Sequence, residues 1–187
     1  MGINLYRNPL TVGSTDGPTL TAAARASSIP VSNRIVLPNN YFYVGKAIKI
    51  TASGRISNAV TTPGTARLDV CLGSAGTTIV YDTGAINLNL VAKTNVPWQF
   101  KLYLVCRAIG TGTSATFFPS GVFQSEAIVG SPVNTVGGDG SLLVPVGAPA
   151  VGAGMDNSAA SALDMFFTQT VATGSFTVHN YIVEELN

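Results

Sequence analysis

From Asn33 onward, apolar and polar residues alternate in short runs, the period-two pattern of β-strands that bury one face. Between Lys46 and Ser53, Ile48 and Ile50 alternate with polar or charged side chains. The longest alternating run extends from Trp98 to Ile109. This alternation predicts a hydrophobic core that includes Ile48, Ile50, Leu68, Val70, Leu72, Phe100, Leu102, Leu104 and Cys106.

Turn signals separate these runs at near-regular spacing. Pro63 and Gly64 stand in the order that type II turns favour, and Gly110–Thr113 separates two of the later runs. The pattern predicts about ten short strands and no convincing helix. Short strands joined by turns are typical of a sandwich or barrel. We therefore expect an all-β protein, with a single antiparallel β-sandwich of jelly-roll type over residues 32–187.

Two segments fall outside the alternating pattern. Residues 1–31 are expected to form an extended N-terminal arm, which cannot bury much of itself alone. Residues 130–161 form an excursion rich in Gly, Pro, Ala and Ser, and loops of such length are usually functional or bound to a partner. We expect the arm and the excursion to make most contacts with other proteins. Deleting residues 1–25 is expected to leave the fold intact and abolish attachment.

Charged residues are scarce. They make up 10% of the 187 residues, against about 25% in an ordinary soluble domain, while apolar residues make up 46%. Mean hydropathy is +0.35. Because a free monomer usually keeps a charged surface, we expect a homo-oligomer or other proteins to cover much of this one.

The distribution of charge and hydropathy also bears on partners. The ten cations and nine anions are scattered singly, which argues against nucleic-acid binding. No apolar run reaches the length of about 18 residues that a membrane-spanning helix needs, so we expect no membrane partner. The opening Met1–Arg7 lacks the apolar region of a secretory signal.

The two cysteines lie in alternating runs with opposite phase. Cys106 falls with the apolar set of its run, whereas Cys71 falls opposite Leu68, Val70 and Leu72. The pattern therefore predicts that Cys106 faces inward and Cys71 outward, and we interpret both as buried or half-buried thiols. It also argues against a disulfide between them.

Candidate catalytic and metal-binding residues are few. His179, the single histidine, lies in an alternating strand rather than a loop, so we interpret it as a surface or interface residue. A zinc site needs several His or Cys side chains at close spacing, and Asp139 between two glycines is weak evidence for calcium. The Gly110–Ala115 string matches a phosphate-binding loop without the helix that should follow, so it predicts a hairpin turn. We expect no enzyme, no cofactor and no metal.

Aromatic residues offer one binding hypothesis. Tyr41, Phe42 and Tyr43 could stack on sugar rings, but such clusters more often plug the end of a sandwich. We favour plugging. A carbohydrate-binding module would use Tyr41, Tyr43 or Tyr103.

Several motifs resemble those of small virion proteins of tailed bacteriophages, of jelly-roll type. The motifs are Leu37–Lys46, Ala52–Ser57, Thr61–Thr65, Val91–Trp98, Cys106–Gly110 and Gly121–Phe123. The resemblance spans roughly residues 30–187 and involves turns and strand starts, with no catalytic residues to transfer. It implies a structural protein of the virion, made in the host cytoplasm, that commonly assembles as a trimer.

The function that this resemblance implies is a capsid decoration (cement) protein. Such a protein binds the major capsid protein and stabilises the head shell. The alternative is a tail, neck or head-fibre component with a receptor- or carbohydrate-binding role.

Overall fold

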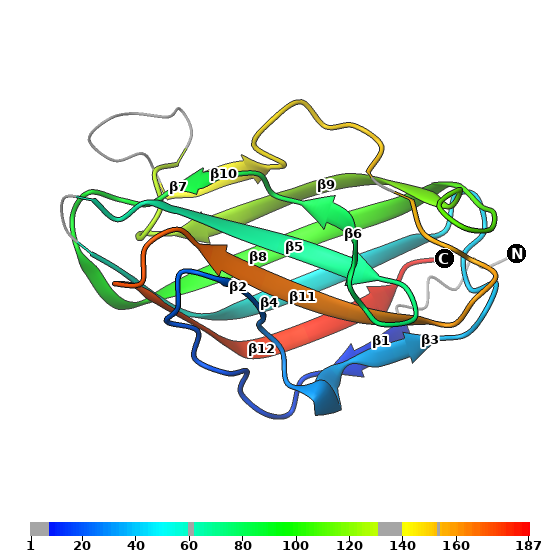
Figure 1. Cartoon of the computed structure of the whole chain (residues 1–187), viewed down its shortest axis with the longest axis horizontal. Helices are drawn as coiled ribbons and strands as arrows, with labels where there is room; N and C mark the ends of the chain where they lie inside the picture. Colours follow the sequence, from blue (N-terminus) through cyan, green and yellow to red (C-terminus); the bar gives the residue numbers. More distant parts are fainter. Residues whose placement is uncertain (1–7, 60–61, 131–139, 153) are drawn as a thin grey trace, which may run out of the picture.

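The computed structural model describes residues 8–59, 62–130, 140–152 and 154–187 as two antiparallel β-sheets packed face to face (Figure 1). The elements are β1 (Asn8–Val12), β2 (Arg25–Ser27), the 3-10 helix η1 (Val31–Asn33), β3 (Ile35–Leu37), β4 (Ala47–Asn58), β5 (Thr65–Leu72), β6 (Thr78–Asp82), β7 (Ile86–Asn87), β8 (Lys93–Ala108), β9 (Thr116–Ser125), β10 (Ser141–Val144), β11 (Ser161–Gln169) and β12 (Ser175–Glu185). The all-β sandwich predicted from the alternation is confirmed.

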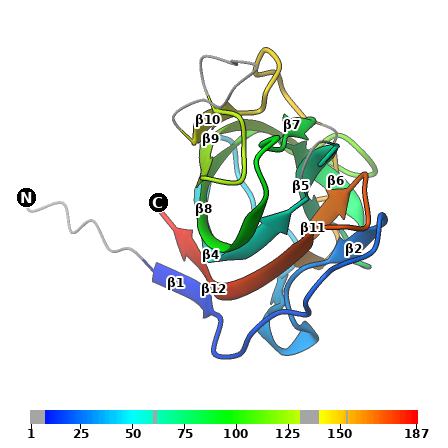
Figure 2. The ribbon, with the colours of Figure 1, turned by 90° about the vertical axis from the view of Figure 1, so that its left-hand side faces the viewer.

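The strand order is that of a jelly roll. One sheet has the order β1-β12-β4-β8-β9-β10 and the other β2-β11-β5-β6. Strands from the two halves of the chain pair in a nested way: β5 with β6, β4 with β8, β2 with β11 and β1 with β12. Eight strands nested in this way form the jelly roll, and the β9–β10 hairpin widens its larger sheet. Figure 2 shows this sheet curving from β10 round to β1, with the smaller sheet opposite.

The described part of the predicted arm belongs to the sandwich. β1 pairs with the last strand, with Asn8 opposite Glu185, and β2 pairs with β11. Between them, Leu20 forms an isolated bridge with Phe176. The boundary near residue 31 is therefore wrong for residues 8–31, which supply the first two strands of the jelly roll. The alternation missed them because each is short and its partner strand lies at the far end of the sequence.

The core lies between the two sheets, and all nine residues predicted for it are buried. Its centre is an aromatic stack. The ring of Phe176 on β12 lies 4.0 Å from that of Phe167 on β11 and 4.5 Å from that of Trp98 on β8. Because β11 belongs to the smaller sheet and the other two strands to the larger, the stack joins the two layers.

One glycine is required by close packing in the larger sheet. Gly54 on β4 pairs with Val178, next to an irregularity in β12 between Val178 and Asn180. A Cβ atom at Gly54 would collide with the backbone carbonyl oxygen of Thr177. Only a residue without a side chain fits here.

The excursion predicted at residues 130–161 contains a strand where the structure describes it. β10 pairs with β9, and Met155 forms an isolated bridge with Ala115. The side chain of Asn157 accepts a hydrogen bond from the Phe42 backbone N–H and donates one to its carbonyl. Much of the described excursion thus packs on its own domain.

Candidate interaction surface

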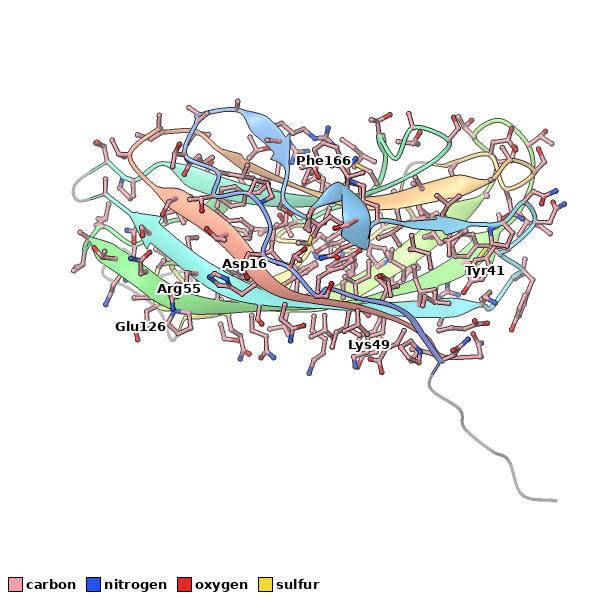
Figure 3. The ribbon with its side chains drawn as sticks, turned by 90° about the horizontal axis from the view of Figure 1, so that it is seen from below. Asp16, Tyr41, Lys49, Arg55, Glu126 and Phe166 are labelled. Atoms are coloured by element: carbon pink, nitrogen blue, oxygen red, sulfur yellow. The ribbon has the colours of Figure 1, made fainter. Side chains whose placement is uncertain are left out.

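His179 lies on the surface, where sequence reasoning placed it. Its Nδ1 is 2.9 Å from Oδ1 of Asp16, and both side chains are in contact with solvent. Figure 3 labels Asp16, which lies on the segment that runs beside β12, where Gly13 and Gly17 donate backbone hydrogen bonds to Tyr181 and Val178. Within the described ranges, no group of three or more His, Cys, Asp or Glu side chains is arranged to hold a metal ion. Asp139 lies outside the described residues.

Both cysteines are buried and neither forms a disulfide. As predicted, Cys71 lies on the outer face of β5, and it is buried there. Arg25 on β2 covers it, and its guanidinium donates a hydrogen bond to the Cys71 sulfur at 2.9 Å. Burial raises the pKa of the Cys71 thiol to about 11. Burial also raises the pKa of Cys106.

The aromatic cluster closes one end of the sandwich. Phe42 is buried edge-on between Tyr41 and Phe117, at ring distances of 5.0 and 4.7 Å. The ammonium group of Lys46 lies 4.1 Å from the centre of the Tyr41 ring. These contacts agree with plugging, and they leave Tyr43, which is 49% exposed, as the accessible aromatic of this cluster.

The Gly110–Ala115 string lies between β8 and β9 in a hairpin, as predicted. Ser114 donates its backbone N–H to the carbonyl of Thr111 at 3.2 Å. No helix follows, because β9 begins at Thr116. The segment therefore lacks the helix N-terminus that holds a phosphate in nucleotide-binding loops.

On the outer face of the smaller sheet, each arginine pairs with a carboxylate of the same chain. Arg25 Nε lies 2.7 Å from Asp69, Arg34 Nε lies 3.1 Å from Asp164, and Arg67 pairs with Asp82. The Arg25 guanidinium also covers the ring of Phe166, labelled in Figure 3, at 3.9 Å. Three cations face three carboxylates, so this surface offers no unbalanced charge to a partner.

The outer face of the larger sheet differs, because it exposes apolar side chains. Side chains on β8, β9 and β10 that point away from the core form a continuous patch, which we call the β8–β10 face; it consists of Tyr103, Val105, Phe118, Val122 and Leu143. Leu143 is 76% exposed and Tyr103 38%. Leu143 is opposite Val122 on the neighbouring strand, and Val105 is opposite Phe118. Contiguous exposed apolar residues mark contact sites on soluble proteins.

Two hollows adjoin this face. One, of about 270 Å³, lies between Lys101, Tyr103 and Leu143. The other is an apolar groove of about 460 Å³ along β10 and the segment after it, and its lining includes Phe118 and Leu143. A partner's side chains could enter both.

A third hollow, of about 500 Å³, is polar. Its lining includes the amides of Asn89, Gln99 and Gln124 and the ion pair between Lys93 and Glu126. Amide and charged groups of this kind are the donors and acceptors that hydroxyl-rich ligands need.

Three cations on the outer face of the larger sheet have no carboxylate partner among the described residues, whereas Lys49, opposite Tyr103, pairs with Glu184. Within the described ranges, most lysines and arginines lie within ion-pair distance of a carboxylate; these are Arg25, Arg34, Lys46, Lys49, Arg67 and Lys93. Arg55, Lys101 and Arg107 have no such partner among the described residues. The Arg107 guanidinium lies 5.1 Å from the centre of the Phe118 ring. All three project from the outer face of the larger sheet, and Figure 3 shows Arg55 there with Lys49.

Sequence reasoning did not identify this surface. The alternation placed Tyr103 opposite the core residues, but it could not show which strands lie beside it. Comparison of the chain with protein-family models, curated proteins and solved structures finds no match. The described part of the chain contains no helix of the length and apolarity that a membrane crossing requires.

Proposed function

We propose that this chain is a non-catalytic structural protein of a bacteriophage virion, a capsid decoration protein that attaches to the head shell. One observation carries the proposal: the β8–β10 face is an exposed apolar patch with adjoining hollows. An exposed apolar patch of this kind usually marks a surface that another molecule covers. The low charge content of the sequence agrees with a protein that spends its life in an assembly.

The fold and the sequence support the same proposal by analogy. Jelly rolls of eight strands are common in viral capsid proteins, although they also occur in lectins and enzymes. The motifs between residues 37 and 123 resemble those of small phage virion proteins. A subunit that binds only the assembled shell adds its binding free energy to the stability of the shell. A trimer around a symmetry axis would multiply weak contacts through avidity.

The test is to locate the chain on particles. Antibodies raised against the recombinant protein are used for immunogold electron microscopy of purified virions, and virions from a strain that lacks the gene are heated until they release DNA. We expect label on the heads, and DNA release at a lower temperature without the protein. Absence of the chain from purified virions would contradict the proposal.

A second candidate is a tail, neck or fibre component that binds a carbohydrate receptor. The polar hollow lined by Asn89, Gln99 and Gln124 favours it, since amide groups can bind sugar hydroxyls. The same microscopy would then show label on the tail. A glycan array would show binding that Gln124→Ala weakens.

A further inference from the structure

We infer that the surface covering the β8–β10 face belongs to a protein other than this chain, is apolar at its centre and carries carboxylates opposite Arg55, Lys101 and Arg107. The inference rests on the proposed function, and names the chemistry of the partner. The unpaired cations indicate the chemistry of the partner, because charge decides which of several apolar surfaces can bind the β8–β10 face.

The three cations flank the apolar side chains, and Lys101 stands at their edge, directly opposite Val122. Lys101 and Arg107 lie on β8 on either side of Tyr103 and Val105, and Arg55 is opposite Pro97 on the neighbouring strand. At about 3.3 Å per residue, Arg55 is about 13 Å and Arg107 about 20 Å from Lys101 along the sheet. An apolar centre with a charged rim is the usual anatomy of a protein interface.

A second copy of this chain does not supply the complementary charge. Each described carboxylate is already engaged: Asp16 pairs with His179, Asp156 accepts hydrogen bonds from Ser158, and the others lie in ion pairs. In a two-fold contact through this face, both surfaces would carry the same three unpaired cations. Like charges brought together across an interface oppose association.

The spacing also disfavours a phosphate-rich partner. Phosphates in lipid headgroups or nucleic acid are bound by dense clusters of cations that act together. Charges on the surface that are more than about 8–10 Å apart are largely screened from each other at physiological ionic strength. Arg55, Lys101 and Arg107 exceed this spacing, so each suits a separate carboxylate.

The local contacts favour ion pairs that lose water on binding. The Arg107 guanidinium rests on Phe118, and Lys101 lines the hollow beside Tyr103 and Leu143. An apolar partner surface that fills this hollow would exclude water around Lys101. A carboxylate brought there at the same time would compensate for the desolvation.

The experiment measures binding of the full chain to purified particles from a strain that lacks its gene. Occupancy is followed by co-sedimentation against protein concentration. The test variant is Arg55→Gln with Lys101→Gln. The matched control is Thr77→Glu with Thr173→Glu, which changes the net charge by the same amount at two exposed sites, in the β5–β6 and β11–β12 turns, away from the β8–β10 face. Thermal unfolding checks that both variants are folded.

We expect the test variant to bind at least about tenfold more weakly and the control to bind within about twofold of wild type. We also expect the affinity of wild type to fall with added NaCl, and that of the test variant to fall less. Equal binding by wild type and test variant would overturn the inference and leave the proposed function standing. No binding of wild type to particles would overturn both.

Two further experiments test whether a second copy of the chain or a phosphate-bearing molecule covers the β8–β10 face. Light scattering compares the mass of wild type and test variant, and self-association lost in the variant would show that a second copy covers the face. Vesicles containing phosphatidylserine and a DNA duplex are the phosphate-bearing probes. Binding of wild type to either at physiological salt, lost in the test variant, would also overturn the inference.

Discussion

Phe176 is the side chain whose loss tests the architecture most directly. It is fully buried, and it stacks between Phe167 from the smaller sheet and Trp98 from the larger. Replacing a buried phenylalanine by alanine removes its contacts and leaves a cavity, at a cost of about 3–5 kcal/mol. Since domains are stable by about 5–15 kcal/mol in total, Phe176→Ala should remove about a fifth or more of the stability.

Urea unfolding followed by tryptophan emission measures this loss. Trp98 is the single tryptophan and is 2% exposed, so its emission reports on the stack itself. With a urea dependence of about 3 kcal/mol per molar for a domain of this size, the midpoint should fall by about 1–1.7 M.

Phe166→Ala is the matched control. It removes the same side chain from the same strand as Phe167, but on the outer face under Arg25. We expect a loss of about 1 kcal/mol, since the exposed cation–π contact contributes about 0.5–1 kcal/mol. If Phe176→Ala costs no more than Phe166→Ala, the stack does not join the sheets as described.

The remaining predictions concern the N-terminal strands, the thiols and the close contact at Gly54. Iodoacetamide should label Cys71 in the native protein at least about 100-fold more slowly than in urea, because burial raises its thiol pKa from 9.0 to about 11 and the thiolate is the reacting species. Mass spectrometry measures how much Cys71 is labelled with time. Fast labelling of the native protein would contradict the burial of Cys71. Arg25→Ala should lower stability by about 1–2 kcal/mol, a value reduced by its partial exposure, and should speed Cys71 labelling, whereas Arg25→Lys retains the charge and should lose less. Deleting residues 1–25 removes β1 and the first residue of β2, so the fold should not stay intact as the sequence pattern led us to expect, and circular dichroism should show an unfolded or aggregated protein. A cooperatively folded truncation would show that these strands are dispensable. Gly54→Ala should cost several kcal/mol in thermal unfolding because of the Thr177 carbonyl, and a loss below about 1 kcal/mol would mean that the backbone yields there.

The alternation was sufficient for the strands that form the centre of each sheet. It placed Ile50 and Phe100 in the core, and both are fully buried. It could not identify β2, whose three residues pair with β11 far along the chain. It favoured a buried or half-buried Cys71, but it could not identify the residue that covers this thiol, which is Arg25 on β2.

The β8–β10 face could not be predicted from the sequence for a related reason. The exposure of Tyr103 follows from its phase on β8, but its proximity to Leu143 depends on β10 pairing with β9. Which cations are unpaired depends on contacts such as Lys46 with Glu185, across nearly the whole chain. Patterns along a sequence report periodicity within a strand, and give little information on which distant strands meet.

The nested pairing of strands also sets the order of events during synthesis. Asn8 in β1 pairs with Glu185 in β12, so the first strand has no partner until almost the whole described chain has left the ribosome. Contacts between residues this distant in sequence form slowly, because a long loop must close before they stabilise anything. Until then Phe176's partners and the edge of β4 are uncovered, and an apolar chain with few charges is prone to aggregate in that interval. The pairing of β1 with β12 is therefore the step after which a newly synthesised chain is protected from aggregation.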